Sequence, residues 1–184
     1  GINQHQMTLL IDKLSLPHRI RLGDDGKIYL GEANKITRFT WATDRLINQQ
    51  TVIDDLDYWK EHLHPLSQFI FDQQNNIIIN AGAYTDDCLE QKDNGLCDYT
   101  STVGLRLYKY DDKTDTWSKN YQQLATGLRN SMAIVQHQSG TLLQAENSID
   151  LDSPNEPYEE INWIQPGKYY GWPYCYNNNA VVDE

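Results

Sequence analysis

The sequence predicts an all-β fold built from repeated units of antiparallel strands, and three similar stretches support this prediction. Residues 19–32, 68–82 and 132–146 each contain an apolar run, a short polar turn and a second apolar run. Two apolar runs joined by a tight polar turn are typical of a β-hairpin. Hairpins that recur along one chain indicate the blades of a β-propeller.

The turns of these three hairpins contain residues that suit a left-handed backbone. Gly26, Asn76 and Gly140 stand at these places, and glycine and asparagine tolerate positive φ better than other residues. The three turns lie 50 and then 64 positions apart, which leaves room for further strands in each unit. About three blades fit in the chain by this spacing. We therefore expect residues 1–184 to form one partial propeller domain.

Further strands are predicted in the intervals between the hairpins. Residues 35–41 and 104–110 alternate between apolar and polar side chains, and this period indicates half-buried strands. Residues 111–116 read as a polar hairpin turn before Trp117. One short helical region is predicted at residues 54–62, where acidic residues come early and a histidine comes late.

An arc of three blades does not close by itself. Propellers close with about four to eight blades, and an open arc leaves strand edges without a partner. We therefore expect either a missing propeller half or an edge-covering partner chain.

The composition argues against two classes of partner. The formal net charge is −11 and the pI is near 4.7, whereas binding to nucleic acid or to an anionic membrane requires a basic face. No apolar run approaches the roughly 20 residues of a membrane-spanning helix. The chain holds twelve Tyr and five Trp, which provide bulky side chains for a core. We therefore expect a globular domain with neither nucleic acid nor a membrane span.

The cysteines suggest an oxidising compartment. Cys88 and Cys97 bracket a short polar loop, so a local disulfide between them is plausible. Such a bond predicts a periplasmic or secreted protein, and two reduced thiols are the alternative. Cys175 is then left over and could pair with a cysteine outside the chain.

Polar side chains cluster at strand ends between residues 124 and 175. Arg129 and Asn130 come just before one predicted strand, and Glu146 directly follows another. Charged and amide groups at strand ends, carried by a rigid sheet, are what a polar ligand site needs.

An acidic pair, Glu159 and Glu160, comes shortly before a turn that reads G-K-Y-Y-G-W-P-Y-C. Together with Glu146, these carboxylates offer hard oxygen ligands of the kind that calcium prefers. The spacing of an EF-hand is absent, and a solvated acidic loop is the alternative interpretation.

These motifs resemble the soluble quinoprotein sugar dehydrogenases of the glucose/sorbosone dehydrogenase family. The similarity lies in G-L-R-N at residues 127–130 and in the ordered run from residue 159 to residue 175. The resemblance implies a six-bladed propeller about twice as long as this chain. It also implies oxidation of an aldose or related sugar, with hydride transfer to pyrroloquinoline quinone and with calcium helping to hold the quinone.

The resemblance also assigns roles to individual residues. His64 takes the place of the general base, and an ordinary histidine pKa of about 6.5 suits removal of a proton from a sugar hydroxyl. Arg129 and Asn130 would face the quinone. The alternatives are a packed loop histidine, with His62 as a competing base, and an arginine that forms a structural ion pair.

The chain departs from the family pattern at several places. The Gly-Gly-Arg that follows the histidine is replaced by residues 65–68. The acidic residue that orients the histidine becomes Ala83, although Asp86 or Asp87 could substitute for it. Ser148 replaces a glycine of the calcium-binding turn. Basic residues that bind the quinone carboxylates come from later blades of the family and are absent here.

The departures at Gln68, Ala83 and Ser148 favour a second hypothesis of a different class. In this hypothesis the chain belongs to a non-catalytic propeller that binds a carbohydrate or a protein partner. A third hypothesis is a calcium-binding structural repeat of an extracellular protein. Cofactor binding separates the enzyme from the binding module, since only the enzyme needs the quinone.

Overall fold

A computed structural model describes residues 7–54, 56, 64–86, 103–151, 155–177 and 180–181. Every regular element in these ranges is a β-strand, so the predicted all-β class is confirmed for them. The cysteine pair Cys88 and Cys97 lies outside the described residues, as does most of the short helical region predicted at 54–62.

The first sheet is a four-stranded antiparallel meander in the order β1-β2-β3-β4. Its strands are β1 (Arg19–Leu22), β2 (Ile28–Glu32), β3 (Lys35–Ala42) and β4 (Arg45–Ile53). Between β1 and β2, Gly26 has a φ of 72°. The Asp25 carboxylate accepts a hydrogen bond from the N–H of Lys27 at 3.0 Å and tightens the same turn. The turn predicted at Gly26 is therefore confirmed.

The second sheet has five strands in the order β14-β10-β7-β6-β5. They are β5 (Phe69–Phe71), β6 (Ile77–Ala81), β7 (Gly104–Tyr108), β10 (Gln122–Thr126) and β14 (Lys168–Tyr169). The first four are antiparallel, and β14 adds parallel to β10. A small hairpin of β8 (Tyr110–Asp111) and β9 (Thr116–Trp117) extends from β7, at the predicted turn.

The turn between β5 and β6 differs from the prediction by one residue. Positive φ occurs at Asn75, at 61°, and not at Asn76. The side chain of Asn76 instead donates to Asp72 at 2.8 Å and accepts from the N–H of Tyr110 at 2.9 Å. Asn76 therefore ties the turn to the β8–β9 hairpin, and its neighbour makes the bend.

The third sheet has three strands in the order β11-β12-β13. They are β11 (Asn130–Gln136), β12 (Leu142–Asn147) and β13 (Glu160–Ile164). Gly140 makes the predicted turn with a φ of 87°. A short pair, β15 (Cys175–Tyr176) and β16 (Ala180–Val181), follows near the end of the described chain.

The second sheet is buried on both faces. On β6, Ile77 and Ile79 pack with Tyr29 of the first sheet. Ile78, which points the opposite way, packs with Ile134 of the third sheet. Successive strand residues face opposite sides of a sheet, so one apolar strand serves two cores.

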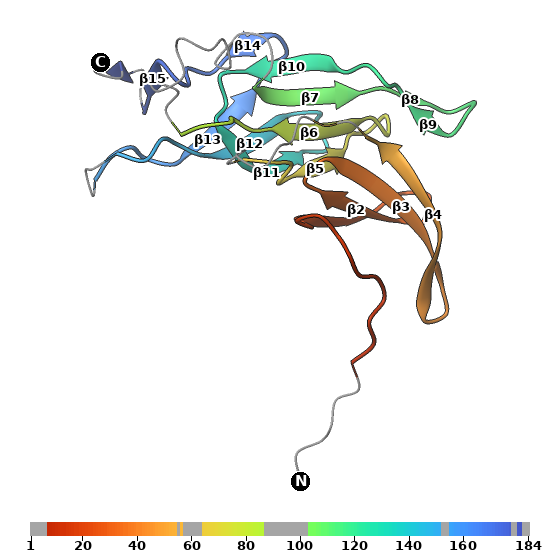
Figure 1. Cartoon of the computed structure of the whole chain (residues 1–184). Helices are drawn as coiled ribbons and strands as arrows, with labels where there is room; N and C mark the ends of the chain where they lie inside the picture. Colours follow the sequence, from red (N-terminus) through yellow and green to blue (C-terminus); the bar gives the residue numbers. More distant parts are fainter. Residues whose placement is uncertain are drawn as a thin grey trace.

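Three sheets therefore pack face to face in chain order (Figure 1). This is the arrangement of three successive propeller blades, and the prediction of about three blades is confirmed.

Each end of the stack presents apolar side chains to solvent. On the first sheet, Ile20 and Leu22 point away from the second sheet and are 68% and 71% exposed. On the third sheet, Ile161 and Trp163 are 79% and 62% exposed. The two inner interfaces bury faces of the same kind, so these end faces are where further blades would pack.

Candidate functional site

His64 precedes β5 and lies beside the segment that leaves β6. Its Nδ1 is 2.7 Å from the backbone oxygen of Ala83. A carbonyl oxygen only accepts hydrogen bonds, so Nδ1 carries the proton, and in the neutral ring the lone pair lies on Nε2. The half-buried ring is thus fixed in one tautomer, with Nε2 as its basic atom.

Arg129 immediately precedes β11 and is 4% exposed. Its Nη2 forms an ion pair with the Asp86 carboxylate, and its Nε donates to the Asp86 backbone oxygen at 3.0 Å. Its Nη1 donates to the backbone oxygen of Asn147 at 3.4 Å. The guanidinium is therefore held rigidly, with its charge compensated by a carboxylate.

Asp86 is the centre of this arrangement. Its carboxylate also accepts the N–H of Asp150 at 3.1 Å, and its backbone oxygen accepts the indole N–H of Trp172 at 3.0 Å. The G-W-P turn and the loop after β12 are thereby joined to Arg129. Asp86 is one of the two acidic residues that could substitute for the family's orienting residue, but its carboxylate pairs with Arg129, and the Ala83 carbonyl bonds to the histidine. Asp87, the other residue suggested for this role, lies outside the described residues.

Asn130 belongs to a chain of buried amides and hydroxyls. Its Oδ1 accepts from the side-chain nitrogen of Asn80 at 3.3 Å, and that nitrogen also donates to Ser67 at 2.9 Å. Asn80 Oδ1 accepts the N–H of Ser131 at 3.1 Å, and Gln144 donates to the Ser131 hydroxyl at 2.9 Å. The network crosses from the second sheet to the third and fixes the start of β11.

The sequence interpretation missed the inner members of this network. Asn80 ends the run I-I-I-N in β6, and Gln144 interrupts the apolar strand β12. A polar residue on the buried face of a strand is the signal that could have identified both, because buried amides need partners.

Glu146 is the titratable group at the end of the network. It is 8% exposed. One carboxyl oxygen accepts the backbone N–H of Arg129, and the other accepts from Gln144 at 3.2 Å. Burial raises the pKa of Glu146 to about 8, and the nearby Glu160 carboxylate adds to the rise. Glu146 is therefore mainly protonated at neutral pH.

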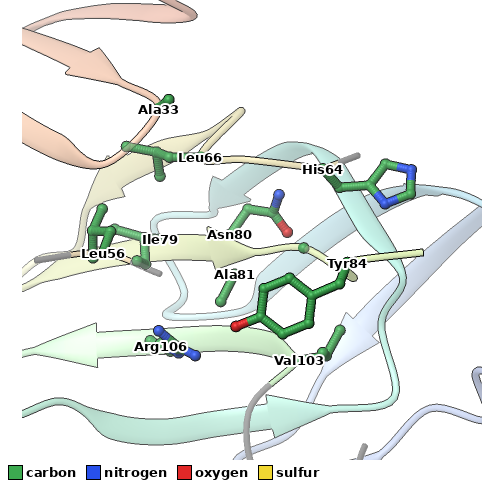
Figure 2. A pocket seen from close by; sticks show the side chains of 11 residues that line it. Ala33, Leu56, His64, Leu66, Ile79, Asn80, Ala81, Tyr84, Val103 and Arg106 are labelled. Carbon is green, nitrogen blue, oxygen red and sulfur yellow. The ribbon is translucent and has the colours of Figure 1, made fainter. Parts of the chain in front are cut away.

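A small cavity lies between the first and second sheets near His64 (Figure 2). Its volume is about 20 Å³, which is room for about one water molecule. Tyr84 and Arg106 line it, and the His64 ring points away from the other labelled side chains. A cavity of this volume is smaller than a sugar ring.

The comparison with protein families identifies the group to which the sequence belongs. The sequence profile of the TrAA12-like family matches residues 1–183. The chain belongs to this family. No protein with a curated function matches the sequence.

Several solved structures are similar to this TrAA12-like chain. The calcium structure of a Trichoderma reesei carbohydrate-active enzyme of family AA12 has a TM-score of 0.66 at 20% identity, over 92% of this chain and 46% of that chain. The holo form of the pyranose dehydrogenase PQQ domain from Coprinopsis cinerea has a TM-score of 0.63 at 15% identity, over 91% of this chain and 56% of that chain. The soluble aldose sugar dehydrogenase from Escherichia coli, in the apo form, has a TM-score of 0.52 at 21% identity, over 85% of this chain and 44% of that chain.

These similarities confirm the predicted family and its propeller fold. The TrAA12-like chain spans about half the length of the solved proteins that it matches. In the part of the chain that the structure describes, no helix is long and apolar enough to cross a membrane.

The carboxylates predicted for calcium do not gather into one site. Glu160 lies opposite Glu146 in the β12–β13 ladder, whereas Glu159 accepts the N–H of Ser148 at 3.0 Å. Among the described residues, no group of three or more His, Cys, Asp or Glu side chains is placed to hold a metal ion. These three glutamates therefore do not fit calcium as a carboxylate site. Cys175 is a free thiol in this structure.

Proposed function

We propose that this chain is part of a quinoprotein sugar dehydrogenase, an enzyme that oxidises an aldose or related sugar and passes a hydride to pyrroloquinoline quinone. Membership of the TrAA12-like family and the shared fold support the proposal. The observation that carries it is the contact between His64 and Ala83, because it gives the proposed base a defined tautomer.

His64 is the general base in this proposal. Its Nε2 accepts the proton of the sugar hydroxyl while the carbon that bears this hydroxyl loses a hydride. The quinone, when bound, supplies the hydride acceptor. A base that is fixed before the substrate arrives needs no reorganisation during the reaction.

Arg129 and Asn130 are the quinone-facing residues in this proposal. They suit an oxygen-rich cofactor in their chemistry, since one carries a fixed positive charge and the other an amide. Arg129 is linked to the His64 segment, because its backbone oxygen accepts the N–H of Ala83 at 2.7 Å. A rigid, buried cation stabilises charge on a neighbouring oxygen more strongly than a mobile, solvated one.

Calcium is proposed as the second cofactor on the similarity to the AA12 enzyme, whose calcium structure is known. The glutamates at 146, 159 and 160 do not support it as a joint ligand set. No catalytic step is therefore assigned to a metal.

Full activity requires the rest of the propeller, since the chain spans about half of its solved relatives. The basic groups for the quinone carboxylates are expected on blades beyond this chain. A periplasmic or secreted location, with a Cys88–Cys97 disulfide, belongs to the same proposal. Mass measurement after alkylation, with and without reductant, tests the disulfide.

The decisive test is a titration of a chain extended to the whole propeller with pyrroloquinoline quinone and calcium, followed by absorbance and melting temperature. We expect saturable binding, and sugar-dependent turnover that is lost in His64→Ala while binding persists. His137→Ala is the matched control, because His137 lies in an exposed turn. Absence of quinone binding by the extended chain would overturn the enzyme assignment.

Two observations favour the alternative, a non-catalytic propeller that binds a carbohydrate or a protein. The Arg129 charge is already compensated by Asp86, and Ala83 replaces the family's acidic residue. In that case the extended chain would bind a sugar or a partner without quinone, and His64→Ala would leave this binding unchanged.

A further inference from the structure

One residue of main chain bonds to two residues of the candidate site at once. The carbonyl of Ala83 accepts from Nδ1 of His64 at 2.7 Å, and the N–H of Ala83 donates to the Arg129 carbonyl at 2.7 Å. The proposed base and the proposed quinone-facing arginine are therefore joined through a single residue of main chain.

This residue is itself anchored by packing. Ala83 is 0% exposed and belongs to a buried cluster with Val103, Ile149 and Trp172. Burial in this cluster places the residue beside His64, and its two main-chain hydrogen bonds set the direction of its carbonyl.

The preceding residue allows the close approach to His64. A Cβ at Gly82 would lie 2.5 Å from the backbone oxygen of His64 and 2.6 Å from its Cβ. Both distances are far shorter than a van der Waals contact, and the first involves backbone that cannot swing aside. Gly82 does not have a positive φ. The glycine is therefore required by its neighbour His64 and not by its own backbone conformation.

We propose that the main-chain segment formed by Gly82 and Ala83 is the positioning element of this site. Gly82 brings the chain against His64, and the Ala83 carbonyl sets the tautomer with the lone pair on Nε2. The main chain thus takes over the role that an acidic side chain performs in the family pattern. The consequence for catalysis rests on the proposed function, whereas the tautomer itself does not.

Two substitutions separate the effect of the main chain on the His64 tautomer from the effect of the side chains. Ala83→Gly keeps the carbonyl and the N–H, so the His64 tautomer should persist. Gly82→Ala forces His64 and the Gly82-Ala83 segment apart, so the tautomer should be lost or mixed. Gly140→Ala is the control for a glycine substitution, since its added Cβ meets nothing within 4 Å and its strain comes only from positive φ.

The test is long-range ¹H–¹⁵N correlation spectroscopy of the histidine-labelled chain, with His64 assigned by the loss of its signals in His64→Gln. We expect a protonated Nδ1 and an unprotonated Nε2 in the neutral ring, in the unmodified chain, in Ala83→Gly and in Gly140→Ala. A proton on Nε2 in the unmodified chain would overturn the proposal, as would an unchanged tautomer in Gly82→Ala. If Gly82→Ala does not fold, the unmodified chain and Ala83→Gly decide the question.

A kinetic measurement on the quinone-loaded, extended enzyme tests the catalytic consequence. We expect Gly82→Ala to lower kcat by about 10- to 100-fold with little change in KM, as displacement of a base does. Unchanged turnover in His64→Ala would remove the base role but leave the tautomer result standing. The failure of the proposed function is thus distinguishable from failure of the positioning role.

Discussion

The two interfaces between the three sheets are built from different side chains. The first interface joins β1–β4 to the second sheet through aromatic rings packed among aliphatic side chains, and an ion pair lies beside it. The second interface joins the second sheet to β11–β13 through aliphatic side chains and includes buried amides. The candidate site residues lie at the second interface and at the adjoining loop.

At the first interface, the rings meet edge to face. The centroids of Tyr29 and Phe71 are 4.7 Å apart, and those of Phe69 and Phe71 are 6.1 Å apart. Arg38 binds the Asp115 carboxylate with two hydrogen bonds, of 3.0 and 2.8 Å. No directional polar network is needed within such a core, because apolar burial and ring packing supply most of the stabilisation.

At the second interface, polar groups are buried and matched. Asn80, Ser131 and Gln144 are each at most 1% exposed, and Ser131 forms hydrogen bonds with both of the others. Buried polar groups stabilise little in net terms, but each is costly when it is left without a partner. The comparison indicates that the first interface mainly provides stability, whereas the second determines where Arg129 and Asn130 lie.

The largest expected effect is at the first interface. Phe69→Ala removes a ring that is 0% exposed and should lower the free energy of unfolding by about 3–5 kcal/mol. Urea unfolding followed by Trp fluorescence measures the change. Ile78→Val, at the second interface, is the comparison variant with an expected loss of about 1 kcal/mol. A loss of about 1 kcal/mol or less in Phe69→Ala would contradict the assignment of stability to the first interface.

A smaller but more specific effect is expected at the second interface. Gln144→Leu leaves the Ser131 hydroxyl and the Asn162 amide without this partner. The substitution should lower the free energy of unfolding by about 1–3 kcal/mol. The same variant should perturb the backbone amide signals of residues 129–131 in NMR spectra. Gln138→Leu, in the exposed turn, is the control. Unperturbed signals at 129–131 would show that the network does not set the position of the site.

Much of the fold could be predicted from the sequence because strand alternation and turn residues are local signals. The turns at Gly26 and Gly140 follow from glycine alone. The turn at Asn75 was misplaced by one residue, because which asparagine bends and which one bonds depends on Tyr110, a residue distant in sequence.

The site could be predicted only in part. His64 and Arg129 remain proposed site residues, which the motifs suggest, but their partners are set by tertiary contacts that no local pattern encodes. A backbone carbonyl at Ala83 cannot be recognised from residue type. The pairing of Asp86 with Arg129 joins residues 43 positions apart, and either of two acidic neighbours fitted the sequence equally well.

The buried carboxyl of Glu146 gives the second interface a pH dependence. Burial raises its pKa from 4.5 to about 8, so the folded protein binds more protons than the unfolded chain between these values. Stability should therefore fall as pH rises through this window, by at most about 1.4 kcal/mol per pH unit.

Urea unfolding at pH 6 and pH 8, in the presence of a chelator, measures this slope. Glu146→Gln keeps an acceptor for the Arg129 N–H and should flatten it. Glu159→Gln should leave the slope unchanged. The same dependence of stability on pH in the unmodified chain and in Glu146→Gln would mean that Glu146 is already ionised in the folded state at pH 6.

The smallest effect is expected at the ion pair beside the first interface. Hydrogen bonds from Arg38 lower the pKa of Asp115 to about 2, and its side chain is 47% exposed. A carboxylate with a lowered pKa stabilises the fold at pH values above the ordinary pKa of that group. This contribution is lost as the pH falls toward 2. Asp115→Asn should cost about 1 kcal/mol or less at pH 7, because solvent screens an exposed pair.

The variant and the unmodified chain should converge in stability near pH 2, as measured by thermal unfolding across pH 2–7. Added salt should also narrow the difference between them at pH 7. A loss at pH 7 as large as that of Phe69→Ala would mean that Arg38 and Asp115, and not the aromatic core, hold the first two sheets together.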